Sequence, residues 1–235
     1  YFSSFSSSWV EHARAFADKL TQKLRLDGNS LVVEIASNDG YLLKHFLAKG
    51  IPVLGIEPAA NVAKAAEAAG VKTEVAFFGF ETATRLAKDG LQADLMAANN
   101  VMAHVPDIND FIAGVPILLG ESGVFTIEFP HLLNLIEKVQ FDTIYHEHYS
   151  YLSLLTVEKI LGAHGLAVFD VEELPTHGGS LRIYACHKEC MLYPPTGGLE
   201  AVREKEHVAG LASLDAYSDF TPRVEGVRAA LLDFL

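Results

Sequence analysis

Cysteine is nearly absent from this sequence, which has only Cys186 and Cys190 in 235 residues. Two cysteines exclude a framework of several disulfides and favour a reducing, cytoplasmic location. With His187 between them they offer three zinc ligands, fewer than the four of a structural site. We therefore expect both cysteines to be incidental and no metal to be bound there.

Positive charge and long apolar runs are scarce too. The chain has 18 lysines and arginines against 30 aspartates and glutamates, a formal net charge of −12. An acidic surface repels phosphate backbones and anionic lipids, so we expect no nucleic acid and no membrane as a partner.

No apolar run approaches the ~20 residues that span a bilayer. The first residues lack the basic and apolar regions of a signal peptide, and no Met begins the chain, so we expect a fragment or a processed product.

Strands and helices are predicted to alternate through most of the chain, after an amphipathic leading helix at about 9–26. Five short apolar segments are expected to form strands: 31–36, 52–57, 71–77, 93–99 and 123–130. Four segments with helical character lie between them: 41–49, 59–69, 82–88 and 108–119. This alternation predicts a doubly wound α/β sheet whose parallel strands are covered by helices on both faces.

The last part of the chain breaks that alternation. After a predicted helix at 156–164, two strands at 166–174 and 180–187 are separated by only five residues. Such a short link cannot hold a crossover helix, so these strands are expected to pair antiparallel. A seven-stranded sheet ending in an antiparallel hairpin is typical of class I methyltransferases and argues against an NAD-type dehydrogenase. We divide the chain into a methyltransferase-like domain at 1–188 and, at 189–235, a linker with the start of a truncated C-terminal domain of one or two helices.

The first predicted strand ends in a loop similar to the acidic-x-Gly-x-Gly-x-Gly loop that binds S-adenosylmethionine (SAM) in class I methyltransferases. The residues given a part in SAM binding are Glu34, Ala36, Ser37, Asn38, Asp39 and Gly40. Ala36 and Asn38 stand at the first two glycine positions, where small residues let the backbone approach the cofactor. Asp39 is a candidate for holding the ammonium or carboxylate end of SAM. An ordinary strand-to-helix turn is the alternative interpretation.

The ends of later strands provide candidates for binding the adenosine part. Glu57, followed by Pro58, ends the second strand 17 residues after Gly40. An acidic side chain there can accept hydrogen bonds from both ribose hydroxyls. The alternative for Glu57 is a helix cap ahead of Pro58. A flat ring beside an amide suits adenine, and the candidates at the next strand ends are Phe78, Asn99 and Asn100, although Phe78 could equally belong to the core.

The segment 141–151, FDTIYHEHYSY, concentrates histidines, tyrosines and carboxylates just after the fifth strand. Histidine is a natural base near neutral pH, and a tyrosine can donate to a developing oxyanion. In an extended segment His146 and His148 would share a face, which leaves a metal site as the alternative, but no third and fourth ligand stands out. The segment therefore predicts a catalytic loop, and we expect it to hold no metal.

Five motifs together resemble the sugar C-methyltransferases of deoxysugar biosynthesis: EIASNDG, GIEP, NNVMAHVPD, FDTIYHEHYSYLS and HGGSLRIY. The resemblance runs from about residue 1 to 187 and is most specific at YHEHYSYLS. It implies methyl transfer from SAM to the carbon beside the ketone of a nucleotide-linked 4-keto-hexose. It also implies a catalytic set, which on this chain is Tyr145, Glu147, His148 and His104. The family's N-terminal zinc-binding cysteine pairs and most of its C-terminal domain have no counterpart in these residues.

The chemistry of C-methylation explains this set. Carbon becomes nucleophilic only after a base removes a proton next to a carbonyl group, which gives an enolate. We expect His148 to be the base, with Tyr145 or His104 holding the enolate oxygen. Glu147 would orient the base or contact the sugar. The sequence thus predicts a SAM-dependent C-methyltransferase whose nucleotide-sugar substrate is a dTDP-4-keto-deoxyhexose. Methyl transfer to oxygen or nitrogen of another small molecule, and a non-catalytic binding domain, are the alternatives.

Overall fold

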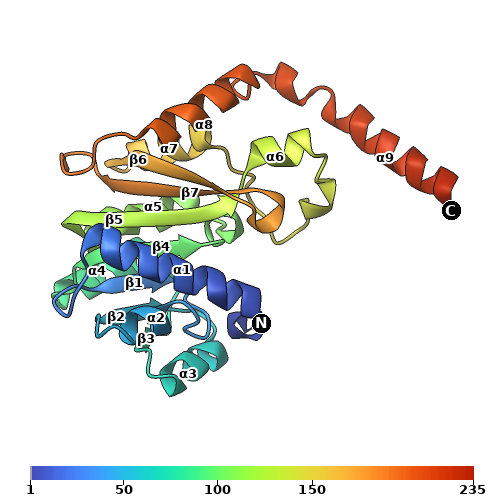
Figure 1. The fold of residues 1–235 in the computed structure, drawn as a ribbon. Coiled ribbons are helices and arrows are strands. Elements are labelled where there is room, and N and C mark those ends of the chain that lie inside the picture. The colour runs from blue at the N-terminus through green and yellow to red at the C-terminus, as the bar shows by residue number, and fades with distance from the viewer. Residues whose placement is uncertain (1) are drawn as a thin grey trace.

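Seven short strands form one sheet in the computed structural model, which describes residues 2–235 (Figure 1). They are β1 (Val32–Ile35), β2 (Val53–Ile56), β3 (Thr73–Glu74), β4 (Ala93–Asn99), β5 (Leu119–Pro130), β6 (Leu166–Leu174) and β7 (Ser180–His187). Their order across the sheet is β3-β2-β1-β4-β5-β7-β6. The first five are parallel, whereas β7 is antiparallel to both β5 and β6. The doubly wound sheet and its terminal antiparallel hairpin are both confirmed.

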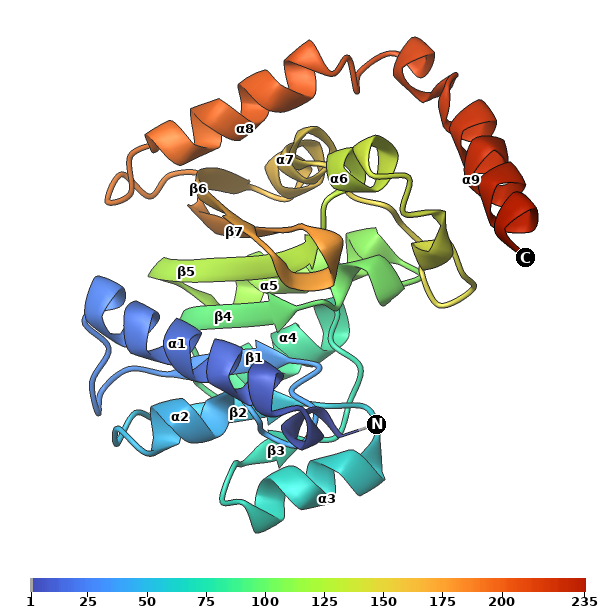
Figure 2. The same ribbon diagram turned by 45° about the vertical axis from the view of Figure 1, so that its right-hand side comes forward.

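Helices cover both faces of this sheet (Figure 2). The α-helices within residues 2–235 are α1 (Ser7–Leu24), α2 (Leu43–Leu47), α3 (Ala60–Ala68), α4 (Phe80–Lys88), α5 (Ile108–Leu118), α6 (Leu132–Glu137), α7 (Leu154–Ala163), α8 (Gly197–Val208) and α9 (Phe220–Phe234), of which α9 lies off the sheet. Two apolar clusters result. One joins α1, α2 and α3 to the sheet, and the other joins α4, α5, α7 and α8 to its opposite face. No helix within residues 2–235 is both long and apolar enough to cross a membrane.

Polar side chains fix where several helices begin. The Ser6 hydroxyl accepts a hydrogen bond from the backbone of Trp9 at the start of α1. Asp107, Ser153 and Thr196 cap α5, α7 and α8 in the same way. Each cap satisfies a backbone N–H group that has no partner within its own helix. The start of α1 is thereby set just outside the carboxyl end of the sheet, where the site described below lies.

The third strand is the clearest departure from the predicted elements. A strand was expected at 71–77, but β3 pairs with β2 at only two positions, Thr73 and Glu74. Val75 and Phe77 are 50% and 82% exposed, so the apolar side chains that suggested a longer strand face solvent instead of a neighbouring layer. The prediction of a longer strand was wrong because alternation of apolar residues does not reveal whether a partner strand is present.

The C-terminal region divides between α8 and α9. Leu199 and Val202 of α8 belong to the main core, so this helix is part of the same body as the sheet. Helix α9 buries none of its residues and extends away from the sheet in both views (Figures 1 and 2). Arg223 connects it to the rest of the chain by donating hydrogen bonds to the carbonyl groups of Ile136 and Glu137 at the end of α6. The domain boundary at 188 stays a prediction.

Candidate cofactor and acceptor site

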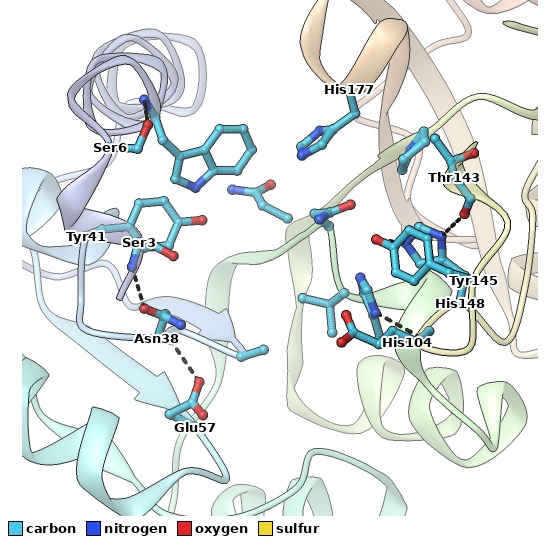
Figure 3. A pocket seen from close by; sticks show the side chains of 17 residues that line it. Ser3, Ser6, Asn38, Tyr41, Glu57, His104, Thr143, Tyr145, His148 and His177 are labelled. Carbon is cyan, nitrogen blue, oxygen red and sulfur yellow. Dashed lines mark hydrogen bonds between the residues drawn. The ribbon is translucent and has the colours of Figure 1, made fainter. Parts of the chain in front are cut away.

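One cavity of about 610 Å³ lies at the carboxyl ends of β1, β2 and β4 and extends toward the segment after β5 (Figure 3). It brings together residues from both predicted groups. From the cofactor group it is lined by Ala36, Asn38, Glu57, Asn99 and Asn100. All four residues of the predicted catalytic set also line it: His104, Tyr145, Glu147 and His148. A molecule bound at the cofactor loop would therefore share one space with the histidines.

The loop after β1 adopts the backbone shape that its similarity to a glycine motif requires. Ala36, Asn38 and Gly40 have φ values of 53°, 50° and 76°, in the left-handed region that glycine enters most easily. These are the three positions aligned with the motif glycines. A Cβ atom on Gly40 would also lie 2.9 Å from a methyl carbon of Val71. The loop thus has the conformation of a glycine-rich cofactor loop although two of its glycines are replaced.

Glu57, at the end of β2, accepts hydrogen bonds from two backbone N–H groups. Its Oε1 accepts from the backbone N–H of Ala59, ahead of α3, and its Oε2 accepts from the backbone N–H of Asn38 in the cofactor loop. Although the residue is only 6% exposed, it lines the cavity. Because a carboxylate oxygen has two lone pairs, each can accept a further hydrogen bond from a ribose hydroxyl. Helix α3 begins at Ala60 and its N-cap is Ala59, so the alternative of Glu57 as a helix cap ahead of Pro58 was wrong, and ribose binding stays a prediction.

The N-terminal segment lies directly on the cofactor loop, which the sequence did not reveal. The backbone N–H of Ser3 donates to Oδ1 of Asn38 at 2.8 Å. The backbone N–H and hydroxyl of Ser4 both donate to Oδ2 of Asp39. Ser3, Ser6 and Trp9 line the cavity in consequence, whereas Asp39 itself does not. The partner of Asp39 in this structure is thus the N-terminal segment.

Several predicted cofactor residues lie away from the cavity lining. Glu34 is 1% exposed, and burial raises the pKa of its carboxyl well above the usual range, against an opposing hydrogen bond from Tyr41. Ser37 points toward Gly55 of β2, where an added Cβ would meet its hydroxyl. Phe78 packs edge-on against Phe111 and contacts the core, so it does not line the cavity. Gly40 and Pro58 are not among the lining residues either. Glu34, Ser37 and Gly40 therefore support the loop from behind.

Asn99 and Asn100 remain as polar groups facing the cavity from the end of β4. The Oδ1 atom of each is buried and has no hydrogen-bond partner within the described residues. A buried polar atom without a partner is costly, and a ligand bearing N–H or O–H groups would remove that cost. Together with Glu57 and the left-handed cofactor loop, these atoms fit the adenosine and amino-acid parts of SAM.

The opposite wall of the cavity is built by the segment after β5, and its geometry centres on His148. The Nδ1 atom of His148 lies 3.0 Å from the carbonyl oxygen of Thr143, and its Nε2 lies 3.3 Å from the Tyr145 hydroxyl. A carbonyl oxygen can only accept, so Nδ1 carries the proton in the neutral ring and Nε2 has the lone pair. The Tyr145 hydroxyl then donates to Nε2. His148 thus lines the cavity with Nε2 as its accepting nitrogen.

His104 is fixed in the same tautomer by its neighbour. Its Nδ1 lies 3.1 Å from the carbonyl oxygen of Glu147, which leaves Nε2 as the acceptor in the neutral ring. Its ring centroid is 4.7 Å from that of His148. Burial, and then the charge of His148, lower the pKa of His104. The neutral form is favoured, so His104 presents a lone pair rather than a donor.

The loop after β4 and the segment after β5 are joined through the backbone. The N–H groups of Tyr149 and Ser150 donate to the carbonyl oxygen of Ala103, next to His104. This contact fixes the positions of the two rings relative to each other. The exposed His146 does not line the cavity, and no group of three or more potential ligands within residues 2–235 is arranged to hold a metal ion.

Four lining residues that the sequence did not single out lie between the two walls or next to them: Trp9, Tyr41, Thr143 and His177. Trp9 stacks on Tyr41 with ring centroids 6.2 Å apart and meets the edge of His177 at 5.5 Å. His177 begins the motif HGGSLRIY, which contributes to the family resemblance but does not by itself indicate a role for this histidine. The residues around Trp9 do not indicate that it lines the cavity, because its position there depends on how α1 packs against the sheet.

A buried ionic cluster fixes α1 over the cavity. Oε2 of Glu128 on β5 accepts from Arg182 on β7 at 2.8 Å and lies 3.0 Å from Nε2 of His12 on α1. Burial works against ionisation of Glu128, but the hydrogen bond from His12 and the charge of Arg182 outweigh it, so the pKa of Glu128 is lowered. His12 also stacks on Trp9. The cluster therefore positions the helix that carries Trp9.

Comparison with known proteins agrees with this architecture. A family model described as a methyltransferase domain matches residues 9–171, and another described as a C-methyltransferase C-terminal domain matches residues 175–235. The C-methyltransferase NovU of Streptomyces niveus is 35% identical over 235 residues, which is 100% of this chain and 56% of NovU. The chain thus spans about half the length of this relative.

Solved structures resemble the chain in fold. A SAM-dependent methyltransferase from Clostridium acetobutylicum has a TM-score of 0.58 at 13% identity and covers 75% of this chain and 91% of its own. Magnesium protoporphyrin IX methyltransferase (ChlM) from Synechocystis PCC 6803 with bound SAH has a TM-score of 0.57 at 18% identity, with 76% and 84% covered. Since a methyltransferase-domain model also matches well over half of the residues, the chain belongs to the methyltransferase-domain family and has the class I fold of the SAM-dependent methyltransferases.

Proposed function

We propose that the protein is a SAM-dependent C-methyltransferase that methylates the carbon next to the ketone of a dTDP-4-keto-deoxyhexose. The observation that carries this proposal is the accepting Nε2 of His148 in the same cavity as the cofactor loop. The C-methyltransferase C-terminal model and the similarity to NovU support transfer to carbon. The nucleotide-sugar substrate rests on the resemblance of the motifs.

We assign cofactor binding and proton removal to the following residues. The loop at Ala36, Asn38 and Gly40, with Glu57, binds SAM, which supplies an electrophilic methyl group when bound. Nε2 of His148 takes the proton from the carbon beside the ketone, and the Thr143 carbonyl stabilises the protonated ring through Nδ1. The walls of the cavity hold the two reactants in line, which provides much of the rate increase.

The same residues allow a smaller role for His104 and Glu147 than the resemblance implied. A neutral His104 accepts at Nε2, so we assign it a contact with a sugar hydroxyl. Glu147 holds His104 in this tautomer through its backbone carbonyl, while its side chain is exposed. We also propose a cytoplasmic location, supported by the two cysteines, both of which are free.

Methyl transfer to a hydroxyl oxygen is the competing function, because His148 could equally deprotonate an alcohol. One experiment separates the two. The full-length polypeptide is incubated with SAM and a dTDP-4-keto-deoxyhexose, and the product is examined by NMR. A new carbon–carbon bond beside the ketone, with exchange of that position's hydrogen in D2O, supports the proposal. An O-methyl ether, or no product despite SAM binding, would refute it.

A further inference from the structure

His177 lies in the five-residue link between β6 and β7 and has a conformation that is uncommon for residues other than glycine. Its φ and ψ are 51° and 36°, in the left-handed region, and Gly178 and Gly179 follow with φ of 80° and 129°. Left-handed backbone at a residue other than glycine is rare and tends to occur at functional sites. The conformation turns His177 toward the cavity, where Figure 3 shows its ring between Tyr41 on one side and Tyr145 and His148 on the other.

The link that carries His177 is held on several sides. Lys138 and Gln140 both donate to the carbonyl oxygen of Gly178, and the Thr176 hydroxyl donates to Glu128. A Cβ atom on Gly178 would collide with the Gln140 side chain. The His177 ring itself packs edge-on against Trp9. This ring is thus presented by a fixed support and not by a free loop.

The hydrogen-bonding groups of His177 are free. Neither ring nitrogen has a hydrogen-bond partner among residues 2–235, although every other histidine that lines the cavity has one. Burial lowers the pKa of His177, the carboxylate of Glu128 opposes this, and His12, His148 and His104 lower it further. The ring is therefore neutral at pH 7, with one N–H donor and one acceptor, and can adopt either tautomer.

The other two imidazoles that line the cavity and the Tyr145 hydroxyl already have hydrogen-bond partners. His104 and His148 both use Nδ1–H on a backbone carbonyl and present only lone pairs. The Tyr145 hydroxyl donates to Nε2 of His148. Proton removal beside a ketone requires a donor for the ketone oxygen, because negative charge develops there. His177 is the imidazole on this wall that can provide one without giving up an existing bond.

We propose that His177 donates its ring N–H to the substrate oxygen that becomes the enolate oxygen, an assignment that rests on the proposed function. The Tyr145 hydroxyl releases Nε2 of His148, which frees its lone pair. The carbon–hydrogen bond breaks, its proton goes to Nε2 of His148, and its electron pair shifts to form the enolate, whose oxygen is held by His177. The pair then forms the new carbon–carbon bond to the methyl group, while the sulfur–carbon bond electrons stay on sulfur. His177 neither gains nor loses a proton over this sequence.

Two substitutions in the full-length polypeptide test the assignment. His177→Phe keeps a ring against Trp9 but has no N–H group. His177→Asn keeps an N–H donor and suits a left-handed backbone. His207→Phe is the matched control, because His207 is exposed on α8 and is not among the residues that line the cavity. SAM affinity is measured by calorimetry, and turnover and D2O exchange are measured with a dTDP-4-keto-deoxyhexose.

The expected result is a fall in kcat of about 10²–10³-fold for His177→Phe, as for loss of one oxyanion donor, with KM and SAM affinity unchanged. Exchange of the hydrogen beside the ketone should fall with kcat, and His177→Asn should recover part of both. Unchanged kcat, or a higher KM alone, overturns the proposal, since a hydroxyl contact would act on binding only. If His177→Phe no longer binds SAM, the kcat and KM of His177→Asn are compared with those of wild type instead, and an unchanged kcat again overturns the proposal. Wild-type protein that binds SAM without turning over the sugar refutes the proposed function itself, and this assignment with it.

Discussion

Oε1 of Glu206 lies 2.8 Å from Nε2 of His131, and both residues are buried, at 3% and 2% exposure. The same carboxylate accepts from the backbone N–H groups of Leu154 and Leu155 at the start of α7. Glu206 belongs to α8, whereas His131 follows β5 directly. One acidic side chain thus holds together the end of strand β5, the start of one helix and the last turn of another.

Replacement of Glu206 should therefore destabilise the whole fold. Glu206→Ala leaves two backbone N–H groups and Nε2 of His131 buried without a partner, so we expect the free energy of unfolding to fall by about 2–5 kcal/mol. Chemical denaturation measures this. Glu204→Ala on the same helix is the control, because Glu204 is exposed and should change stability by no more than about 0.5 kcal/mol. Equal stability of the two variants would contradict the role given to Glu206.

Glu57 should control affinity for SAM. Glu57→Ala removes the carboxylate that faces the cavity, and we expect SAM binding to weaken by about 1–3 kcal/mol, the range for a lost hydrogen bond to a charged group. Because the variant also loses the bonds to Asn38 and Ala59, its thermal unfolding should be recorded beside the titration. Glu67→Ala, at an exposed position on α3, is the comparison. An unaltered dissociation constant in folded Glu57→Ala would rule out ribose binding.

His148 should control turnover and not cofactor binding. We expect His148→Asn to bind SAM normally but to lose turnover by about 10²–10⁴-fold, the range for general base catalysis. Exchange of the substrate hydrogen in D2O should disappear with it. His146→Asn, two residues away but outside the cavity, should keep wild-type turnover. If His148→Asn remains active, the base has to be sought at His104.

The Glu128 cluster should make stability depend on pH at the acid end. Burial opposes the charged form, but His12 and Arg182 lower the pKa of Glu128 in the folded state below its unfolded value. A group of this kind stabilises the fold above its unfolded pKa, about 4.3, and its contribution is lost as the pH falls through the folded pKa. Unfolding experiments between about pH 6 and pH 3 should show a steep loss of stability in wild-type protein.

Glu128→Gln should have a shallower acid limb than wild type, because the amide cannot titrate. Glu121→Gln is the control, since Glu121 is exposed on the same strand. His12 and Arg182 face Glu128 directly, and His177 and Tyr41 are further titratable groups whose charge couples to it. An unchanged acid limb in Glu128→Gln would mean that other carboxylates set the acid stability.

The fold was predictable because its determinants are local in the sequence. Apolar strands that alternate with helices define the parallel part of the sheet, and the short link at 175–179 leaves β6 and β7 only an antiparallel pairing. The left-handed loop at Ala36 and Asn38 could also be anticipated from similarity to a glycine motif. The length of β3 could not, because it depends on a partner strand and not on its own pattern.

Residues on both walls of the cavity were named from the sequence, but several of their neighbours were not. His104, Tyr145 and His148 were found because they cluster in two short segments next to strand ends. Trp9 and Tyr41 were missed because the first comes from a helix distant in sequence and the second follows the cofactor loop. Phe78 was placed beside adenine by its position after a strand, but its ring packs against Phe111 instead. The positions of Trp9, Tyr41 and Phe78 relative to the cavity depend on tertiary packing, which the local sequence pattern does not show.

Trp9 is the only tryptophan in the chain, and it lines the cavity between Tyr41 and His177. The intrinsic fluorescence of the protein excited at the indole band therefore originates from one side chain, located where cofactor and acceptor would meet. Its emission should change when either is added, without any label. Stopped-flow recording of this signal would give the order in which the two molecules arrive, with each variant described above reporting from the same ring.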